Sequence, residues 1–191
     1  MVQEVEDIFK IGIYRVNLDI DKKFWVEFCN RFEKKEPSEY HSNTGYQGHL
    51  KDYQNPFLDG LKKTIIEHSK KYVDYLSYKV DSLEVQAMWI NINYFKDINL
   101  PHQHGENLVS GVLYLQTHEK SGALVFKNPA DRLDVQDEKV INYNNYNSGV
   151  WKIVPTEGEL ILFPSWFVHY VEPNLNETNR RISMSFNINT K

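Results

Sequence analysis

The chain has 191 residues, a formal net charge of −4, 41% hydrophobic residues and 14% aromatic residues. Its length suits a single domain over 1–191 that buries a sizeable core. The acidic balance excludes a large basic surface for the phosphate backbone of duplex nucleic acid, so nucleic acid is not expected as a partner.

The single cysteine and the absence of long apolar runs indicate the compartment. Cys29 is the only cysteine, which excludes an intrachain disulfide framework and a zinc site made of several thiolates. Neither a signal-peptide pattern nor an apolar run of about 18 residues is present, so no membrane segment is expected. We therefore expect a cytoplasmic protein.

Two amphipathic helices are predicted in residues 1–82. Asp21 can cap the first and Asn55 the second, with Pro56 at the first helical position. Apolar residues recur behind these caps at spacings of three and four, which places them on one helix face. They are Phe24, Trp25, Phe28, Cys29 and Phe32 in the first helix, and Phe57, Leu61, Ile65, Tyr72 and Leu76 in the second.

From residue 83 onward the sequence consists of short β-branched and aromatic runs separated by Gly, Pro, Asn and Asp. Six or more strands at this spacing predict a barrel or sandwich rather than a parallel doubly wound sheet. We expect a mainly β fold with flanking helices, in which 1–82 is mostly helical and covers a double-stranded β-helix (a jelly roll, as in cupins) formed by 83–191. The runs are LEVQAMWININYF, LVSGVLYLQ, GALVFKNP, GVWKIVP, GELILFPSWFVHYVEP and RRISMSFNIN.

Three histidines are candidate metal ligands. His102 and His104 are two residues apart, and side chains at i and i+2 of a strand point the same way. Both imidazoles could therefore reach one ion at roughly 2.0–2.1 Å. His169, which lies 169 − 102 = 67 residues downstream, ends an apolar strand that can return beside the first in a jelly roll. The ordinary alternative, a hydrogen-bonded or solvent-facing histidine at a strand end, stays open.

An arginine near the C-terminus is the second candidate site residue. In RRISMSFNIN, Arg181, Ser183 and Ser185 alternate with Ile182, Met184 and Phe186 on the other strand face. An inward-facing Arg181 would need a carboxylate from the protein or from a ligand, because an unpaired buried guanidinium is very unfavourable. The alternative is that this arginine is an ordinary exposed residue at the start of a strand.

Taken together, these segments resemble the Fe(II)- and 2-oxoglutarate-dependent oxygenases. That family shares an H-x-D/E motif, a second histidine and, about ten residues later, a basic residue that opens a strand; here the last spacing is 181 − 169 = 12. The chain is most similar to a largely uncharacterised group within the family, from about residue 42 onward. The matching segments are SNTGYQGHL, HQH followed by LVSGVLYL, SGALVF, PTEGELILF, LFPSWFVHYVEPN and RISMSFN.

The resemblance implies Fe(II) as the metal, 2-oxoglutarate as co-substrate, O2 and a small-molecule or peptidyl substrate. It implies His102, His104 and His169 as ligands, although His104 stands where the family usually has a carboxylate. A register shifted to HGE makes Glu106 the alternative ligand. Imidazole suits Fe(II), Zn and Cu alike, so the ligand types do not identify the ion.

The resemblance also implies a binding site for the co-substrate. Arg181, assisted by Ser183 and Tyr114, would bind the far carboxylate of 2-oxoglutarate, and Asn91 or Asn93 would bind its C1 carboxylate. The expected reaction is hydroxylation of an unactivated C–H bond with release of succinate and CO2. The alternatives are a cupin-like three-histidine metalloprotein that does not use 2-oxoglutarate and a non-catalytic jelly-roll binding protein.

Two polar segments are candidates for contact with the substrate. Residues 41–53 could form a lid or a plain surface loop, and 131–149 is a polar insertion between strands. Neither segment indicates which substrate binds.

Overall fold

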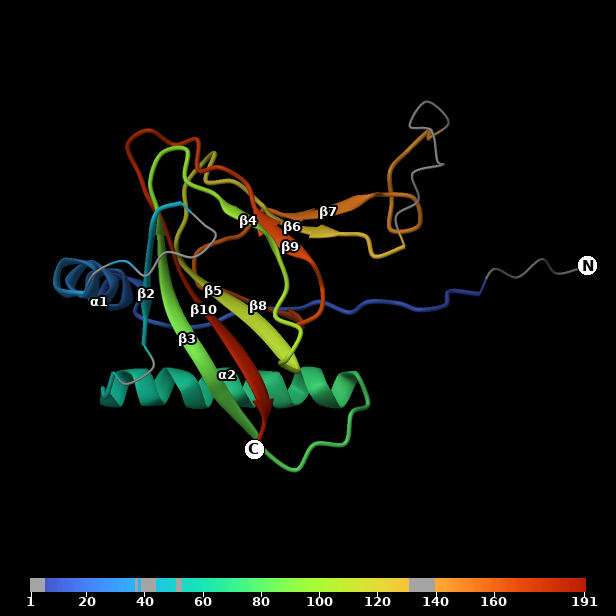
Figure 1. Ribbon diagram of the computed structural model, residues 1–191, viewed down its shortest axis with the longest axis horizontal. Helices are drawn as coiled ribbons and strands as arrows, with labels where there is room; N and C mark the ends of the chain where they lie inside the picture. Colours follow the sequence, from blue (N-terminus) through green and yellow to red (C-terminus); the bar gives the residue numbers. More distant parts are fainter. Residues whose placement is uncertain (1–5, 37, 39–43, 51–52, 131–139) are drawn as a thin grey trace, which may run out of the picture.

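A computed structural model describes residues 6–36, 38, 44–50, 53–130 and 140–191 of the chain. It contains two antiparallel sheets and two helices (Figure 1). The helices are α1 (Lys22–Lys35) and α2 (Pro56–Tyr75), and the strands are β1 (Tyr14–Asn17), β2 (Tyr46–His49), β3 (Leu83–Asn93), β4 (Asn99–His102), β5 (Val109–Gln116), β6 (Leu124–Lys127), β7 (Val150–Ile153), β8 (Glu159–Pro164), β9 (His169–Val171) and β10 (Arg181–Thr190).

The strands from β3 onward form the predicted double-stranded β-helix. The six-stranded sheet has the order β1-β8-β5-β10-β3-β2, and the four-stranded sheet has the order β4-β9-β6-β7. The chain from β3 to β10 passes repeatedly from one sheet to the other, which is the winding of a jelly roll. The prediction of a mainly β fold with flanking helices is confirmed.

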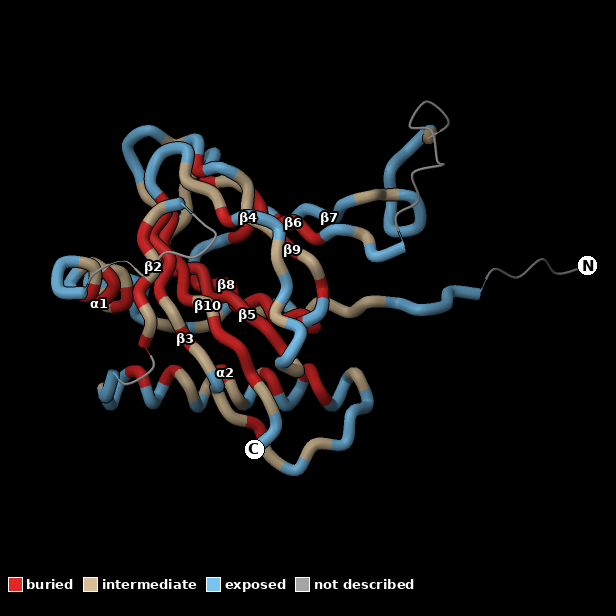
Figure 2. Tube along the Cα trace, in the orientation of Figure 1, coloured by how far each residue is buried: buried red, intermediate tan, exposed pale blue. Residues whose placement is uncertain are grey.

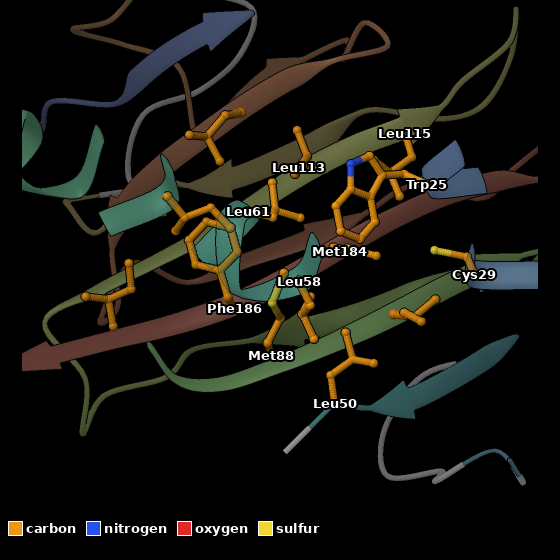
Figure 3. Close-up of a cluster of buried hydrophobic side chains, with 14 of the residues drawn as sticks. Trp25, Cys29, Leu50, Leu58, Leu61, Met88, Leu113, Leu115, Met184 and Phe186 are labelled. Atoms are coloured by element: carbon orange, nitrogen blue, oxygen red, sulfur yellow. The ribbon is translucent and has the colours of Figure 1, made fainter. Parts of the chain in front are cut away.

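Both helices pack on the outer face of the six-stranded sheet, as expected from their apolar faces (Figures 1 and 3). The Asp21 carboxylate accepts a hydrogen bond from the Phe24 amide at 3.0 Å, and the Asn55 side chain caps α2. The stripe predicted on α2 is wrong at Phe57, which is 63% exposed, whereas Leu58 is fully buried. Phe57 instead packs against the half-buried Phe24, with ring centroids 4.9 Å apart.

One face of strand β10 points into the core beneath the helices, and the other face points into the interior between the two sheets. The strand pairs with β3 on one side and β5 on the other. Ile182, Met184 and Phe186 are fully buried in the core beneath the helices. The alternating residues face the interior, as the sequence predicted.

The N-terminal part also contributes two strands that the sequence did not predict. β1 pairs with β8 and β2 pairs with β3, so each extends an edge of the six-stranded sheet. The segment 41–53, expected as a lid or loop, therefore contains β2, while 41–43 and 51–52 lie outside the described residues.

The polar insertion between β6 and β7 is only partly described. Residues 131–139 lie outside the described part, and 140–149 form mostly exposed turns (Figure 2). Neither α1 nor α2 combines the length and the apolar run that a membrane span needs.

Candidate metal centre

Three histidines from the four-stranded sheet and its connecting turn lie side by side. His102 ends β4 and pairs directly with His169 at the start of β9, while His104 follows in the turn after β4. The ring centroids are 4.4 Å apart for His102 and His169, 4.9 Å for His102 and His104, and 5.5 Å for His104 and His169. One ring nitrogen from each residue lies within 4.8 Å of the others. Antiparallel pairing of β4 with β9 thus joins residues 67 positions apart.

Backbone carbonyls fix the orientation of two of these rings. The Nδ1 atom of His102 lies 2.6 Å from the Leu100 carbonyl oxygen, and that of His169 lies 2.8 Å from the Phe167 carbonyl oxygen. A carbonyl can only accept, so both Nδ1 atoms carry the proton and donate. The lone pair is then on Nε2, which is the usual arrangement of a metal-binding histidine.

Burial keeps two of the imidazoles neutral. It lowers the pKa of His104 to about 4 and that of His169 to about 3, and the neighbouring His102 contributes to both shifts. A metal binds the deprotonated nitrogen, so these rings need not lose a proton at neutral pH. Three convergent imidazoles are a donor set that suits a divalent transition metal such as Fe(II).

Glu106, the alternative ligand, is not part of this cluster. Glu106 is exposed, and its backbone carbonyl oxygen accepts a hydrogen bond from the Asn189 side chain. The His104 amide donates to the Ser165 carbonyl oxygen at 2.8 Å, which holds the turn so that His104 lies beside His102. Within the described residues, the group of possible ligands contains three imidazoles and no carboxylate.

A cavity of about 260 Å³ extends from the histidines between the two sheets. At one end lies Arg181, which is only 1% exposed. Its Nη1 atom donates to the carbonyl oxygens of Ser121 and Glu172, and its Nε atom donates to the Asn93 side chain at 3.4 Å. Its Nη2 atom has no hydrogen-bond partner. No carboxylate of the described chain pairs with this guanidinium, and burial lowers its pKa.

The other residues predicted to bind the co-substrate also line this cavity. Tyr114 is 1% exposed, and burial raises the pKa of its hydroxyl to about 12, so that it stays protonated and can donate. Ser183 lies two residues after Arg181 on the same inward face of β10. Asn93 touches the guanidinium, whereas Asn91 accepts from Gln47 at 2.8 Å and donates to Ser185 at 3.0 Å.

Sequence reasoning missed several cavity residues. Gln47 and His49 come from the unpredicted strand β2, and Ser110 and Asn187 come from predicted strands. Asn187 could have been found, because it continues the alternation of Arg181, Ser183 and Ser185 by one step. Gln47 lies within the segment 41–53 that the sequence marked as a candidate for substrate contact, but nothing singled out this residue, which the pairing of β2 with β3 brings to the cavity.

The fold and the three-imidazole site together define a double-stranded β-helix metalloenzyme. The family model described as "Putative 2OG-Fe(II) oxygenase" matches residues 87–187. The chain belongs to this family of Fe(II)- and 2-oxoglutarate-dependent oxygenases, as its motifs predicted. No curated protein sequence matches it significantly.

Solved structures share the fold at low sequence identity. A prolyl-4-hydroxylase from Pseudomonas putida has a TM-score of 0.68 and 14% identity, over 95% of this chain and 94% of that one. The 2-oxoglutarate complex of a viral collagen prolyl hydroxylase from Paramecium Bursaria Chlorella virus-1 has a TM-score of 0.62 and 12% identity, over 92% and 94%. The α-ketoglutarate-dependent epimerase SnoN from nogalamycin biosynthesis has a TM-score of 0.71 and 12% identity, over 94% and 77%. These hydroxylases and this epimerase share one architecture.

The cofactors expected from the motifs are those of the family. Fe(II) and 2-oxoglutarate serve its members, and one of the similar structures contains Fe3+ and α-ketoglutarate together. Two observations show that the residues present here fit these groups. The clustered imidazoles suit the metal, and the buried Arg181, with its unpartnered Nη2, suits a carboxylate.

Proposed function

We propose that the protein hydroxylates an unactivated C–H bond of a small-molecule or peptidyl substrate, using Fe(II), O2 and 2-oxoglutarate and releasing succinate and CO2. Fe(II) and 2-oxoglutarate, when bound, supply the oxidative decarboxylation that activates dioxygen. The protein's contribution is to bind, orient and shield the reacting groups.

The single observation that carries the proposal is the buried guanidinium without a carboxylate partner. Removing a charge from water costs several kcal/mol, and the hydrogen-bond partners of Arg181 among the described residues are neutral carbonyl and amide oxygens, with Asp97 acting only through its charge and without a hydrogen bond. A carboxylate from a ligand would supply the missing counter-charge and occupy the free Nη2. Tyr114 and Ser183, which line the same end of the cavity, would add two hydroxyl donors.

The proposed ligands of the metal are His102, His104 and His169. Burial keeps the rings of His104 and His169 neutral, and the carbonyl oxygens of Leu100 and Phe167 hold His102 and His169 with Nε2 directed away from the donating Nδ1. This fixed orientation reduces the rotamer entropy lost when a metal binds.

Apolar side chains exclude water from one flank of this centre. Phe163 lies 2% exposed, with its ring centroid 4.6 Å from that of His169, and Phe126 packs on Phe163 at 5.0 Å. Trp89 on β3 also lines the cavity, with its ring centroid 5.5 Å from that of His104. A dry wall strengthens electrostatic interactions inside the site and protects reactive species from water.

A second candidate function follows from the ligand set. Three histidines without a carboxylate also suit a cupin-like metalloenzyme that does not use 2-oxoglutarate. Arg181 separates the two candidates, because only the first function needs an anion at the guanidinium.

The test compares two adjacent arginines. Arg181→Met removes the buried cation, whereas Arg180→Met removes a cation that is already paired with Glu33 at 3.3 Å and with Asn30 at 2.9 Å. Loss of charge-assisted hydrogen bonds should weaken 2-oxoglutarate binding by about 100-fold in the first variant. The second should bind like the wild type. Affinity is measured by anaerobic titration with Fe(II), and succinate release is measured in air. Wild-type affinity in Arg181→Met would support the cupin-like alternative.

A further inference from the structure

The cavity differs sharply in charge between its two ends. Arg181 is the only residue of the described lining with a permanent charge, and no Asp, Glu or Lys is present there. The walls near the histidines present uncharged polar groups, namely Gln47, Asn91, Ser110, Ser185 and Asn187. A cationic substrate group placed there would lose its hydration without meeting an acidic side chain of the lining, and the Fe(II) of the proposed function would repel it.

One of these groups, Asn187, is held in a defined orientation by two serines. The Ser110 hydroxyl donates to the Asn187 side-chain oxygen at 2.8 Å. Ser110 has only one hydroxyl proton, so in its 2.8 Å contact with Ser165 it must accept. The Asn187 Oδ1 is therefore engaged, and Nδ2 is the free end of the side chain.

The free amide nitrogen is a hydrogen-bond donor available to a ligand. Asn187 is 8% exposed and lines the cavity, and its Nδ2 makes no hydrogen bond within the described part of the chain. The Asn187 Nδ2 atom is not fully enclosed by protein atoms, so a molecule in the cavity can reach it. A donor in such a position can donate to an acceptor on a bound molecule in place of the water that otherwise hydrates it.

Asn187 belongs to the metal end of the cavity rather than to the Arg181 end. The two residues are six positions apart on β10, which corresponds to about 20 Å of strand. Ser165, which fixes Asn187 through Ser110, also accepts the His104 amide through its carbonyl oxygen at 2.8 Å. One serine thus orients both a proposed metal ligand and the free donor.

We infer that the substrate group entering beside the three imidazoles is not cationic and carries an oxygen, such as that of an amide or hydroxyl group, that accepts a hydrogen bond from Asn187 Nδ2. Asn187 is then a specificity-determining residue, and Ser110 and Ser165 are positioning residues. This inference rests on the proposed function, because it assigns the Arg181 end to 2-oxoglutarate and leaves the end near the histidines for the substrate.

The first measurement separates this inference from the proposed function. The affinity for 2-oxoglutarate is titrated anaerobically with Fe(II) in the wild type and in Asn187→Leu. Both should bind within about twofold of each other, because Arg181 is intact. Loss of 2-oxoglutarate binding in Asn187→Leu would place Asn187 at the co-substrate and overturn the inference. A wild type that does not bind 2-oxoglutarate would refute the proposed function itself.

The second measurement uses a probe panel on the protein loaded with Fe(II) and 2-oxoglutarate. The probes are N-acetylated amino-acid amides, which are uncharged, and the matched free amines, which are cationic, and binding is followed by saturation-transfer NMR. The uncharged members should bind at least tenfold more tightly than the amines. Asn187→Leu should weaken the uncharged probes by about 3- to 10-fold. Asn187→Asp should shift the preference towards the amines.

A matched control lies on the same strand. Asn189 is two residues beyond Asn187, outside the cavity lining, and its side chain donates to the Glu106 carbonyl oxygen at 3.1 Å. Asn189→Leu should leave all probe affinities unchanged. Equal binding of charged and uncharged probes, no binding of the uncharged ones, or wild-type affinities in Asn187→Leu would each overturn the inference.

Discussion

Acidification should destabilise the metal-free protein through His169. This residue is 5% exposed, and burial lowers the pKa of its imidazole to about 3 from the usual 6.5. Between these values the unfolded chain binds a proton that the folded chain does not. The unfolding free energy therefore falls as the pH drops, and the contribution of His169 is fully present only above pH 6.5.

The size of the effect follows from the two pKa values. Between pH 6 and pH 5 the folded imidazole stays neutral while the unfolded one becomes protonated, which lowers the unfolding free energy by about 1.2 kcal/mol. His104, whose pKa is lowered to about 4, shifts stability in the same direction and by nearly the same amount over this interval, because its folded imidazole also stays mostly neutral down to pH 5.

The assay is urea unfolding in the presence of a chelator at pH 6 and pH 5, for the wild type and for His169→Gln. The variant should lose about 1 kcal/mol less than the wild type over this interval, because it has one titrating group fewer. Between pH 8 and pH 7 both proteins should show nearly the same pH dependence, which serves as the internal control. Equal losses between pH 6 and pH 5 would show that His169 is not held neutral by burial.

Three further predictions concern the metal, the co-substrate and the core. His104→Ala should reduce Fe(II) affinity by at least about 100-fold, and Glu106→Ala should reduce it by less than about twofold. Both affinities are measured by competition with a chelator. Retention of iron in His104→Ala would exclude His104 as a ligand. Tyr114→Phe should weaken 2-oxoglutarate binding by about 3- to 10-fold through the loss of one donor, and unchanged affinity would place the hydroxyl outside the co-substrate site. Gly111→Ala should lower the unfolding free energy by about 1–3 kcal/mol in urea titrations, because its methyl group would overlap the Phe186 ring; an unchanged value would mean that this ring can move aside.

Local signals were sufficient to predict the helices and the alternation of side chains along β10, although they left open whether Arg181 faces inward. Asp21 and Asn55 cap α1 and α2 because a side-chain oxygen next to an amphipathic run satisfies the first free amides. Arg181 and Ser183 face the cavity because side chains alternate along a strand, whatever the strand pairs with.

Non-local pairing determines what the sequence did not reveal. β1 and β2 are only four residues long, YRVN and YQGH, and they are ordered by pairing with the edges of the six-stranded sheet. The bond between Ser110 and Asn187 joins residues 77 positions apart, and that between Ser110 and Ser165 joins residues 55 positions apart. The choice between His104 and Glu106 depends on the path of a turn, which a contact with Ser165 determines.

The two sheets contribute different parts of the site, so the distance between the sheets determines the distance between those parts. The proposed metal ligands belong to the four-stranded sheet and its turn, whereas Arg181 and Asn187 both lie on β10 of the six-stranded sheet. The aromatic residues between the sheets include Phe126 and Phe163, and in the proposed assignment their packing sets the distance from the metal to both β10 side chains. Because strand geometry fixes the separation of Arg181 from Asn187, a co-substrate held at the guanidinium would leave the end near the histidines free for the substrate. The proposed assignment therefore places co-substrate and substrate along a single cavity.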